Sequence, residues 1–294
     1  MNFIYINIKM ESKNDGLFIV GTHTSKGKFK NMYSAIINNN SIAPSRATQI
    51  FTHGPRHNNR NNIDYEKMRL LSGVVKIFIH APYTCFIFKG SDNAFDIMLD
   101  IFRAAQSCNS SGVIIHLPRA SINVIVNNVV RLLKMLNDEQ IKTPIILETP
   151  SNKPHPTMSW ESPEKLTRLI NAFNSIGIDP NRIGLCIDTA HVYAGGAQIS
   201  TRKDATVYLK GLPIERVYLF HLNGNEYKFP KSGDKHAIPL SNLDAIWGCK
   251  KYKESGCFEF VDWSRSLGIP IIFEGKIHHS SDDVNSFIKM CGRV

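Results

Sequence analysis

The segment IGLCIDTAH, from Ile183 to His191, decides the fold. Its first five residues are apolar or glycine, without the alternation that marks a strand with one face in water. A continuous apolar run of this length is typical of a strand buried on both faces, as in a parallel sheet covered by helices. Asp188 and His191 follow at once, so the segment predicts a buried strand whose carboxyl end carries ionisable side chains.

Seven further apolar runs share this character, and most are separated from the next by a segment long enough for a helix. They span Leu17–His23, Ala47–His53, Val75–Tyr83, Gly112–Leu117, Pro144–Pro150, Arg216–Asn223 and Pro270–Gly275. Between them, Ser91–Ser107, Ser121–Leu136 and Ser162–Phe173 repeat apolar residues at the spacing of a helix with one buried face.

Strand and helix alternating in this way predict an α/β fold, the (β/α)8 barrel, as a single domain over residues 17–294. Residues 1–16 are expected to form a short extension before the barrel. A doubly wound open sheet is the competing architecture. No Gly-x-Gly-x-x-Gly turn follows the first run, where Gly21 precedes Thr22 and His23, so the sequence does not support a dinucleotide-binding form of that sheet.

The carboxyl ends of the predicted strands carry most of the histidines and several carboxylates. Catalytic residues of barrels lie at these ends. Here they are His23, His53, His80, His116, Glu148, Asp188, His191, His221 and Glu274, with Asp234 and His236 in the loop after the seventh run. So many ionisable groups at one rim are costly unless cations compensate them. Imidazole and carboxylate without thiolate form a ligand set for Zn²⁺ or Mn²⁺, and several such ions together are a device for phosphodiester hydrolysis.

Basic residues follow the predicted strands, whereas acidic residues concentrate in the predicted helices. Examples after the strands are Lys26, Lys28, Lys30, Arg56, Arg60, Arg119, Lys235 and Lys276. In the whole chain, 35 Lys and Arg outnumber 25 Asp and Glu, which gives a net charge of +10. A cationic ring around a multi-ion site favours a substrate with a phosphate backbone.

The hydropathy and the cysteines of the sequence indicate the compartment in which the protein works. No apolar run approaches the ~20 residues of a membrane-spanning helix, and the first ten residues lack the features of a signal peptide. The six cysteines are scattered and form no Cys-x-x-Cys pair. We therefore expect a monomer without membrane partners, in a reducing intracellular compartment, either cytoplasm or nucleus.

Seven short motifs carry a resemblance to a known family. They are His80-Ala81-Pro82-Tyr83, Ile114-Ile115-His116, Leu147-Glu148-Thr149, Cys186-Ile187-Asp188-Thr189-Ala190-His191, His221-Leu222-Asn223, Asp234-Lys235-His236 and Phe273-Glu274. With them, the sequence resembles the endonuclease IV-type apurinic/apyrimidinic (AP) endonucleases from about residue 17 to residue 290.

The resemblance implies a barrel with three zinc ions, one of which Mn²⁺ could replace. Glu148 would bridge two ions, and Glu148, Asp188 and Glu274 would be the catalytic carboxylates. The implied ligands are His80 and His116 for the first ion; Asp188, His221 and Glu274 for the second; and His191, Asp234 and His236 for the third.

The resemblance also implies the reaction and the substrate. Zinc-activated water would hydrolyse the phosphodiester bond on the 5′ side of an abasic site in double-stranded DNA, leaving a 3′-hydroxyl and a 5′-deoxyribose phosphate. Trimming of blocked 3′ ends is a further family activity. Arg56 and Tyr83 match the positions whose side chains insert into bent DNA beside the extruded nucleotide.

Three positions depart from the family pattern. Thr84 follows Tyr83 where a bulky aliphatic residue is common, and Gly224 replaces an aspartate after His-Leu-Asn. The third is the segment 117–119, Leu-Pro-Arg, in place of a Gly-Ser-His type of turn. None of them removes an implied metal ligand.

Two other functions remain open at this point. A metal-dependent sugar isomerase or epimerase of related barrel type would use Glu148, Asp188, His221 and Glu274. It would leave the remaining histidines and the basic rim without a role. A catalytically silent DNA-binding barrel that retains zinc for folding is the other alternative.

Overall fold

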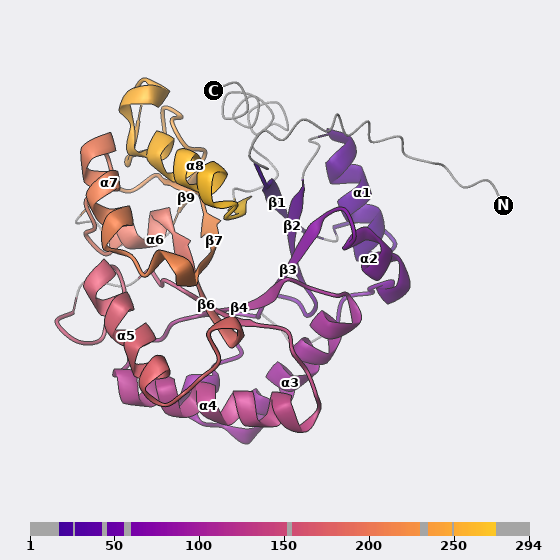
Figure 1. Cartoon of the computed structure of the whole chain (residues 1–294). Helices are drawn as coiled ribbons and strands as arrows, with labels where there is room; N and C mark the ends of the chain where they lie inside the picture. Colours follow the sequence, from indigo (N-terminus) through magenta and orange to yellow (C-terminus); the bar gives the residue numbers. More distant parts are fainter. Residues whose placement is uncertain are drawn as a thin grey trace.

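The computed structural model of the protein describes residues 18–25, 27–42, 46–55, 60–151, 155–229, 235–248 and 250–274. Within them, eight parallel strands close into a barrel in the order β1-β10-β7-β6-β5-β4-β3-β2 (Figure 1). The strands are β1 Val20–Thr24, β2 Ala47–Phe51, β3 Lys76–His80, β4 Gly112–His116, β5 Ile145–Glu148, β6 Ile183–Asp188, β7 Val217–His221 and β10 Ile271–Phe273. The predicted (β/α)8 barrel is confirmed. Because β1 pairs with both β10 and β2, the open sheet is excluded.

Helices follow the strands and lie outside the barrel (Figure 1). They are α1 Met32–Ile42, α2 Tyr65–Leu71, α3 Asp92–Ser107, α4 Ile122–Asp138, α5 Pro163–Ser175, α6 Thr189–Ala194, α7 Arg202–Gly211 and α8 Gly256–Leu267. The three helices expected from the sequence correspond to α3, α4 and α5. Pro163 occupies the start of α5 after Ser162, a position where the missing amide hydrogen of proline removes no helical hydrogen bond.

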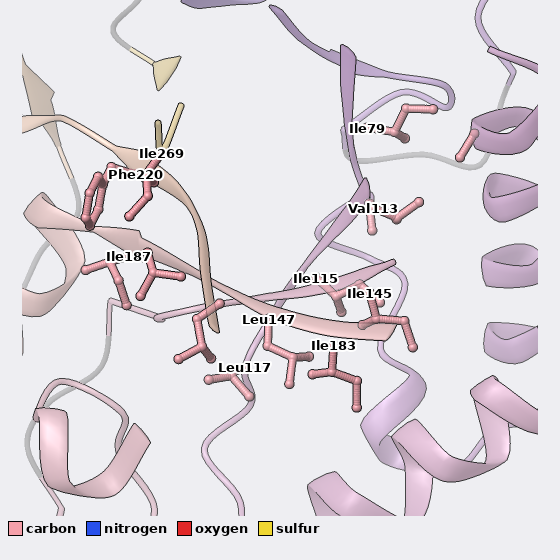
Figure 2. Packing of buried hydrophobic residues seen from close by; sticks show 14 of the residues in the cluster. Ile79, Val113, Ile115, Leu117, Ile145, Leu147, Ile183, Ile187, Phe220 and Ile269 are labelled. Carbon is pink, nitrogen blue, oxygen red and sulfur yellow. The ribbon is translucent and has the colours of Figure 1, made fainter. Parts of the chain in front are cut away.

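A large apolar layer lies between the strands and the helices. Figure 2 shows part of it, where Ile115 of β4, Ile145 and Leu147 of β5 and Ile183 of β6 lie close together. The helices contribute apolar stripes to the same layer, since the buried residues of α4 recur three or four positions apart from Ile125 to Leu136. This explains why the strands are apolar without alternation: their outward side chains contact helices, and their inward side chains fill the barrel.

A smaller apolar layer fills the barrel itself. Its buried members are Ile19, Ala47, Phe78, Ile114, Ile146, Cys186, Leu219 and Ile272. Because side chains alternate between the two faces of a strand, the residue two positions further along each strand again points inward, nearer the carboxyl end. The interior apolar layer therefore forms the floor on which the next ring of side chains lies.

The structure leaves both ends of the chain undescribed. The predicted extension, residues 1–16, lies outside the described residues, as do residues 275–294. Of the helices that the structure describes, none has both the length and the apolar character required to cross a bilayer. The described cysteines are all buried, and no disulfide joins them; they are Cys85, Cys108, Cys186 and Cys257.

Candidate metal centre

The candidate ligands lie two residues beyond the apolar floor of the barrel. They continue the inward faces of β3, β4, β5, β6, β7 and β10, where His80, His116, Glu148, Asp188, His221 and Glu274 follow Phe78, Ile114, Ile146, Cys186, Leu219 and Ile272. Parallel strands that close into a barrel bring these distant positions to one end. The alternation of each strand and the closure of the sheet together assemble the site.

The first group of candidate ligands comprises His80, His116 and Glu148. Nε2 of His80 and Nε2 of His116 lie 3.1 and 3.0 Å from Oε2 of Glu148. Nδ1 of His80 lies 2.7 Å from the carbonyl oxygen of Ala81, which accepts its hydrogen and leaves the lone pair of Nε2 directed into the group. Outer hydrogen bonds of this kind orient histidine ligands in metal sites.

The second group comprises Glu148, Asp188, His221 and Glu274. Nδ1 of His221 lies 3.0 Å from Oε1 of Glu148 and 3.2 Å from Oε2 of Glu274. Oε2 of Glu148 contacts the first group, and Oε1 contacts the second. Glu148 thus has the geometry of a bridging carboxylate between two adjacent groups.

The third group comprises Asp188, His191 and His236. Nδ1 of His191 lies 2.7 Å from the carbonyl oxygen of Thr149, and Nε2 of His236 lies 3.6 Å from Oδ2 of Asp188. Asp188 belongs to the second group as well, so it connects the second and third groups. Asp234 lies outside the described residues, and its place in this group stays a prediction.

Most of the ionisable side chains of the centre are buried away from water. The side chains of Glu148, Asp188 and His221 have no exposed surface. Burial would raise the pKa of Glu148, but its contacts with His116 and His221 hold that pKa well below the ordinary value. Burial raises the pKa of Asp188, although the nearby His191 and His236 oppose this shift.

These groups fit divalent cations. Burial penalises the carboxylates, and the imidazoles around them compensate only by taking up protons. For example, burial lowers the pKa of His221, but Cys186 and the carboxylates of Glu274 and Glu148 raise it well above its usual value. In each group the ligand atoms lie within 4.8 Å of one another, and nitrogen with carboxylate oxygen is the donor set of zinc sites.

Two amide side chains that the sequence interpretation missed support these groups. Nε2 of Gln49 donates to Oε1 of Glu274 at 2.6 Å, and Oε1 of Gln49 lies 2.7 Å from Nε2 of His221. Nδ2 of Asn223 donates to Oδ2 of Asp188 at 2.8 Å. Gln49 lies two residues beyond Ala47 of the apolar floor, so counting alternate residues along β2 would have found it.

Two further histidines at predicted strand ends have different surroundings. Nδ1 of His23 lies 2.9 Å from Nε2 of Gln49, and burial lowers the pKa of His23 to about 4. His23 therefore lies behind the second group as a neutral imidazole. His53 lies apart from the three groups, with Nε2 3.2 Å from Oδ2 of Asp100 on α3.

A cavity of about 940 Å³ opens beside the first and third groups, with His116 and His191 in its lining. Tyr83, Phe86, Lys89 and Arg119 also line it, and the Tyr83 side chain is 45% exposed. The ring of Tyr83 meets that of His116 edge-on, with 5.3 Å between centroids. The cavity therefore combines exposed aromatic rings and cationic side chains next to the candidate ligands.

The loops after β2 and β3 are joined at this cavity. The backbone amide of Tyr83 donates to the carbonyl oxygen of Pro55 at 3.0 Å. Arg56 follows Pro55 directly but lies outside the described residues, so its predicted contact with DNA stays a prediction.

Comparison with known proteins shows similarity to AP endonucleases. The chain is 29% identical over 251 residues to a probable AP endonuclease of African swine fever virus, and the match covers 81% of each protein. It is 25% identical over 250 residues to a probable endonuclease 4 of Methanosphaera stadtmanae, with 78% of this chain and 87% of that protein covered. The chain is thus similar to the endonuclease IV-type AP endonucleases, as the sequence motifs predicted. No family model matches it.

Solved structures share the fold of this protein. The structure of AsfvAP:AG superposes with a TM-score of 0.80 at 21% identity and covers 94% of this chain and 99% of that one. Endonuclease IV from Thermus thermophilus gives a TM-score of 0.72 at 20% identity, with 92% and 97% covered. A D-tagatose 3-epimerase-like protein shares the barrel at 0.63 and 15% identity, with 93% and 97% covered. Fold alone therefore does not separate a nuclease from a sugar epimerase.

Proposed function

We propose that this protein is a zinc-dependent DNA repair endonuclease that acts at abasic sites. It hydrolyses the phosphodiester bond on the 5′ side of the abasic nucleotide and leaves a 3′-hydroxyl and a 5′-deoxyribose phosphate. The observation that carries the proposal is that three groups of histidines and carboxylates adjoin one another and share Glu148 and Asp188. The similarity to a probable AP endonuclease and to a probable endonuclease 4 supports the substrate class.

Each of the three groups of residues would hold one metal ion. His80 and His116 with Glu148 would hold the first ion, Asp188, His221 and Glu274 with Glu148 would hold the second, and His191 and His236 with Asp234 would hold the third. Bound Zn²⁺ lowers the pKa of water towards ~7 and places positive charge beside the phosphate. Glu148, which belongs to both of the first two groups, would keep their ions adjacent. Asp188 aligns the third group with them.

The residues that surround the cavity bind the substrate. Tyr83 and Arg56 fill the gap beside the extruded nucleotide, and Lys89 and Arg119 contact backbone phosphates beside the cavity. The cavity volume of about 940 Å³ lies within the range of small-ligand pockets, roughly 300–1,000 Å³. A hollow of this size accommodates a nucleotide, and this supports trimming of 3′ ends as a second activity at the same centre.

A sugar isomerase or epimerase is less compatible with the site. Such an enzyme uses one or two ions, and the second group alone would suffice for it. His80, His116, His191 and His236 would then lie at the centre without a function. The positive charge of the chain, +10, would also lack a role.

The decisive experiment is an incision assay on a duplex with one tetrahydrofuran abasic analogue, together with elemental analysis of the purified protein. We expect a single cut on the 5′ side of the analogue and about three zinc ions per chain. Sugar turnover without incision would establish the epimerase. Binding without incision in the zinc-loaded protein would establish a silent DNA-binding barrel.

A further inference from the structure

A buried carboxylate outside the ligand groups organises the loop between β7 and α8. Asp244 is 3% exposed, and three backbone amides donate to its side chain. Oδ1 accepts from Ile246 at 2.8 Å and from Asn225 at 3.3 Å, and Oδ2 accepts from Leu240 at 2.8 Å. Backbone amides that converge on one buried carboxylate fix the path of the loop around it.

One of these amides belongs to a strained residue. Leu240 has a φ of 64°, a left-handed conformation that residues with a branched side chain rarely adopt. Such a conformation persists only where the surrounding structure enforces it. The hydrogen bond from the Leu240 amide to Asp244 is one contact that holds it here, four residues after the candidate ligand His236.

The carboxylate also controls the short hairpin that carries His236. Strand β8, Gly224–Asn225, pairs antiparallel with β9, His236–Ala237, so that Asn225 lies opposite His236. Asn225 is held on both sides of its backbone, because its amide donates to Asp244 and its carbonyl oxygen accepts from the amide of Ala245 at 2.6 Å. The position of His236 therefore depends on where Asp244 holds Asn225.

Asp244 occupies the space that a side chain at position 224 would need. A Cβ atom built on Gly224 would lie 2.6 Å from Cγ of Asp244 and 2.8 Å from its Oδ1. A side chain at 224 and the carboxylate of Asp244 therefore exclude each other. Glycine at position 224, directly after His221-Leu222-Asn223, therefore leaves room for the carboxylate of Asp244.

We propose that Asp244 is the positioning residue of the third metal group, and that Gly224 leaves the space that its carboxylate needs. It acts through Asn225 and the β8–β9 hairpin on His236. The inference rests on the proposed metal-dependent function, but its test does not depend on DNA cleavage.

The test is a metal count under mild chelation on purified, zinc-loaded protein. We compare the wild type, Asp244→Ala, Gly224→Asp and the double variant Gly224→Asp/Asp244→Ala. Without this carboxylate the hairpin that carries His236 loses the contact that fixes it, so Asp244→Ala is expected to retain about two zinc ions instead of about three. Gly224→Asp alone is expected to lose the same ion, because its carboxylate collides with Asp244. The double variant restores one carboxylate to the shared space and regains the third ion.

A matched control separates positioning from general stability. Glu259 is also a buried carboxylate, 6% exposed, and pairs with Arg202 on the outside of the barrel. Glu259→Ala is expected to lower the melting temperature and keep the full zinc content. Three zinc ions in Asp244→Ala, or no recovery in a folded double variant, would overturn the inference. So would failure of both Asp244 variants to fold while Glu259→Ala folds, because Asp244 would then serve the whole fold. A wild type without zinc would instead contradict the proposed function.

Discussion

The side-chain oxygen of Gln49 lies 2.7 Å from Nε2 of His221, and the side-chain nitrogen of the same amide lies 2.6 Å from Oε1 of Glu274. An amide oxygen only accepts, so Nε2 of His221 carries a hydrogen and Nδ1 faces Glu148 and Glu274, where its lone pair would be available to a bound cation. One neutral residue on β2 thereby sets the orientation of two candidate ligands on β7 and β10.

We predict that Gln49→Met, which keeps the length of the side chain but removes the amide, weakens zinc binding at the second group by about 10- to 100-fold. Competition with a fluorescent chelator measures this affinity. Gln198→Met is the control, since Gln198 is exposed and bonds to the carbonyl oxygen of Gly196. Unchanged affinity in Gln49→Met would show that His221 and Glu274 orient without the amide.

The bridging geometry of Glu148 gives a second prediction. Glu148→Gln keeps the shape of the side chain but removes the charge shared by the first two groups. We expect incision to fall by more than about 100-fold, the upper end of the effect of an outer partner, while affinity for abasic DNA changes little. Single-turnover incision and fluorescence anisotropy separate the two quantities. Glu161→Gln, which loses an ion pair with Lys165 away from the centre, should keep wild-type incision.

His23 gives a prediction for the pH dependence of stability. Burial lowers its pKa from 6.5 to about 4. Between these two pH values, His23 is therefore protonated in the unfolded chain and neutral in the folded protein. The contribution of neutral His23 is present above pH 6.5 and declines as the pH falls towards 4. The slope in that window is at most roughly 1.4 kcal/mol per pH unit.

Urea unfolding of the metal-stripped protein between pH 7 and pH 4 measures this slope. His23→Gln removes the titrating group and keeps a side chain that can accept from Gln49. We expect the variant to lose less stability than the wild type between these two pH values. Parallel pH profiles for the two proteins would mean that His23 does not hold its low pKa.

Tyr83 is predicted to supply discrimination rather than affinity. Its ring is 45% exposed beside the cavity, and an aromatic ring stacked on a base contributes about 1–3 kcal/mol. Tyr83→Ala should therefore reduce the preference for abasic over intact duplex by about 5- to 100-fold, with a smaller change in binding to intact duplex. Tyr65→Ala is the matched control, since Tyr65 is 38% exposed on α2. Equal losses on both duplexes would make Tyr83 an ordinary packing residue.

Much of the barrel and the ligand groups could be predicted from the sequence, because both depend on local patterns. A buried strand is apolar throughout, and the first ionisable residue at its end shows which face it continues. Glu148 after Leu147 and Asp188 after Ile187 are of this kind. Because the strands are parallel and close into a barrel, these strand-end residues then lie together at one end of it.

The supporting residues could not be predicted in the same way. His53 lies four residues after Gln49 and would point to the same face if the strand continued. Strand β2 ends at Phe51, however, and His53 lies in the following loop, where its side chain contacts Asp100. Asp244 lies in an irregular loop, where no periodicity relates sequence to direction. Its proximity to Gly224 is a tertiary contact twenty residues apart.

The cationic rim yields a final prediction. If Lys89 and Arg119 contact phosphates at the cavity, affinity for abasic duplex falls steeply as salt increases, because binding releases condensed counterions. Replacing one of them by alanine should reduce the slope of log affinity against log salt by about 1, equally for different flanking sequences. Fluorescence anisotropy between low and moderate salt measures the slope. Lys142→Ala, an exposed lysine before β5, should leave it unchanged. A slope that Arg119→Ala and Lys89→Ala both fail to alter would place the DNA backbone elsewhere on the rim.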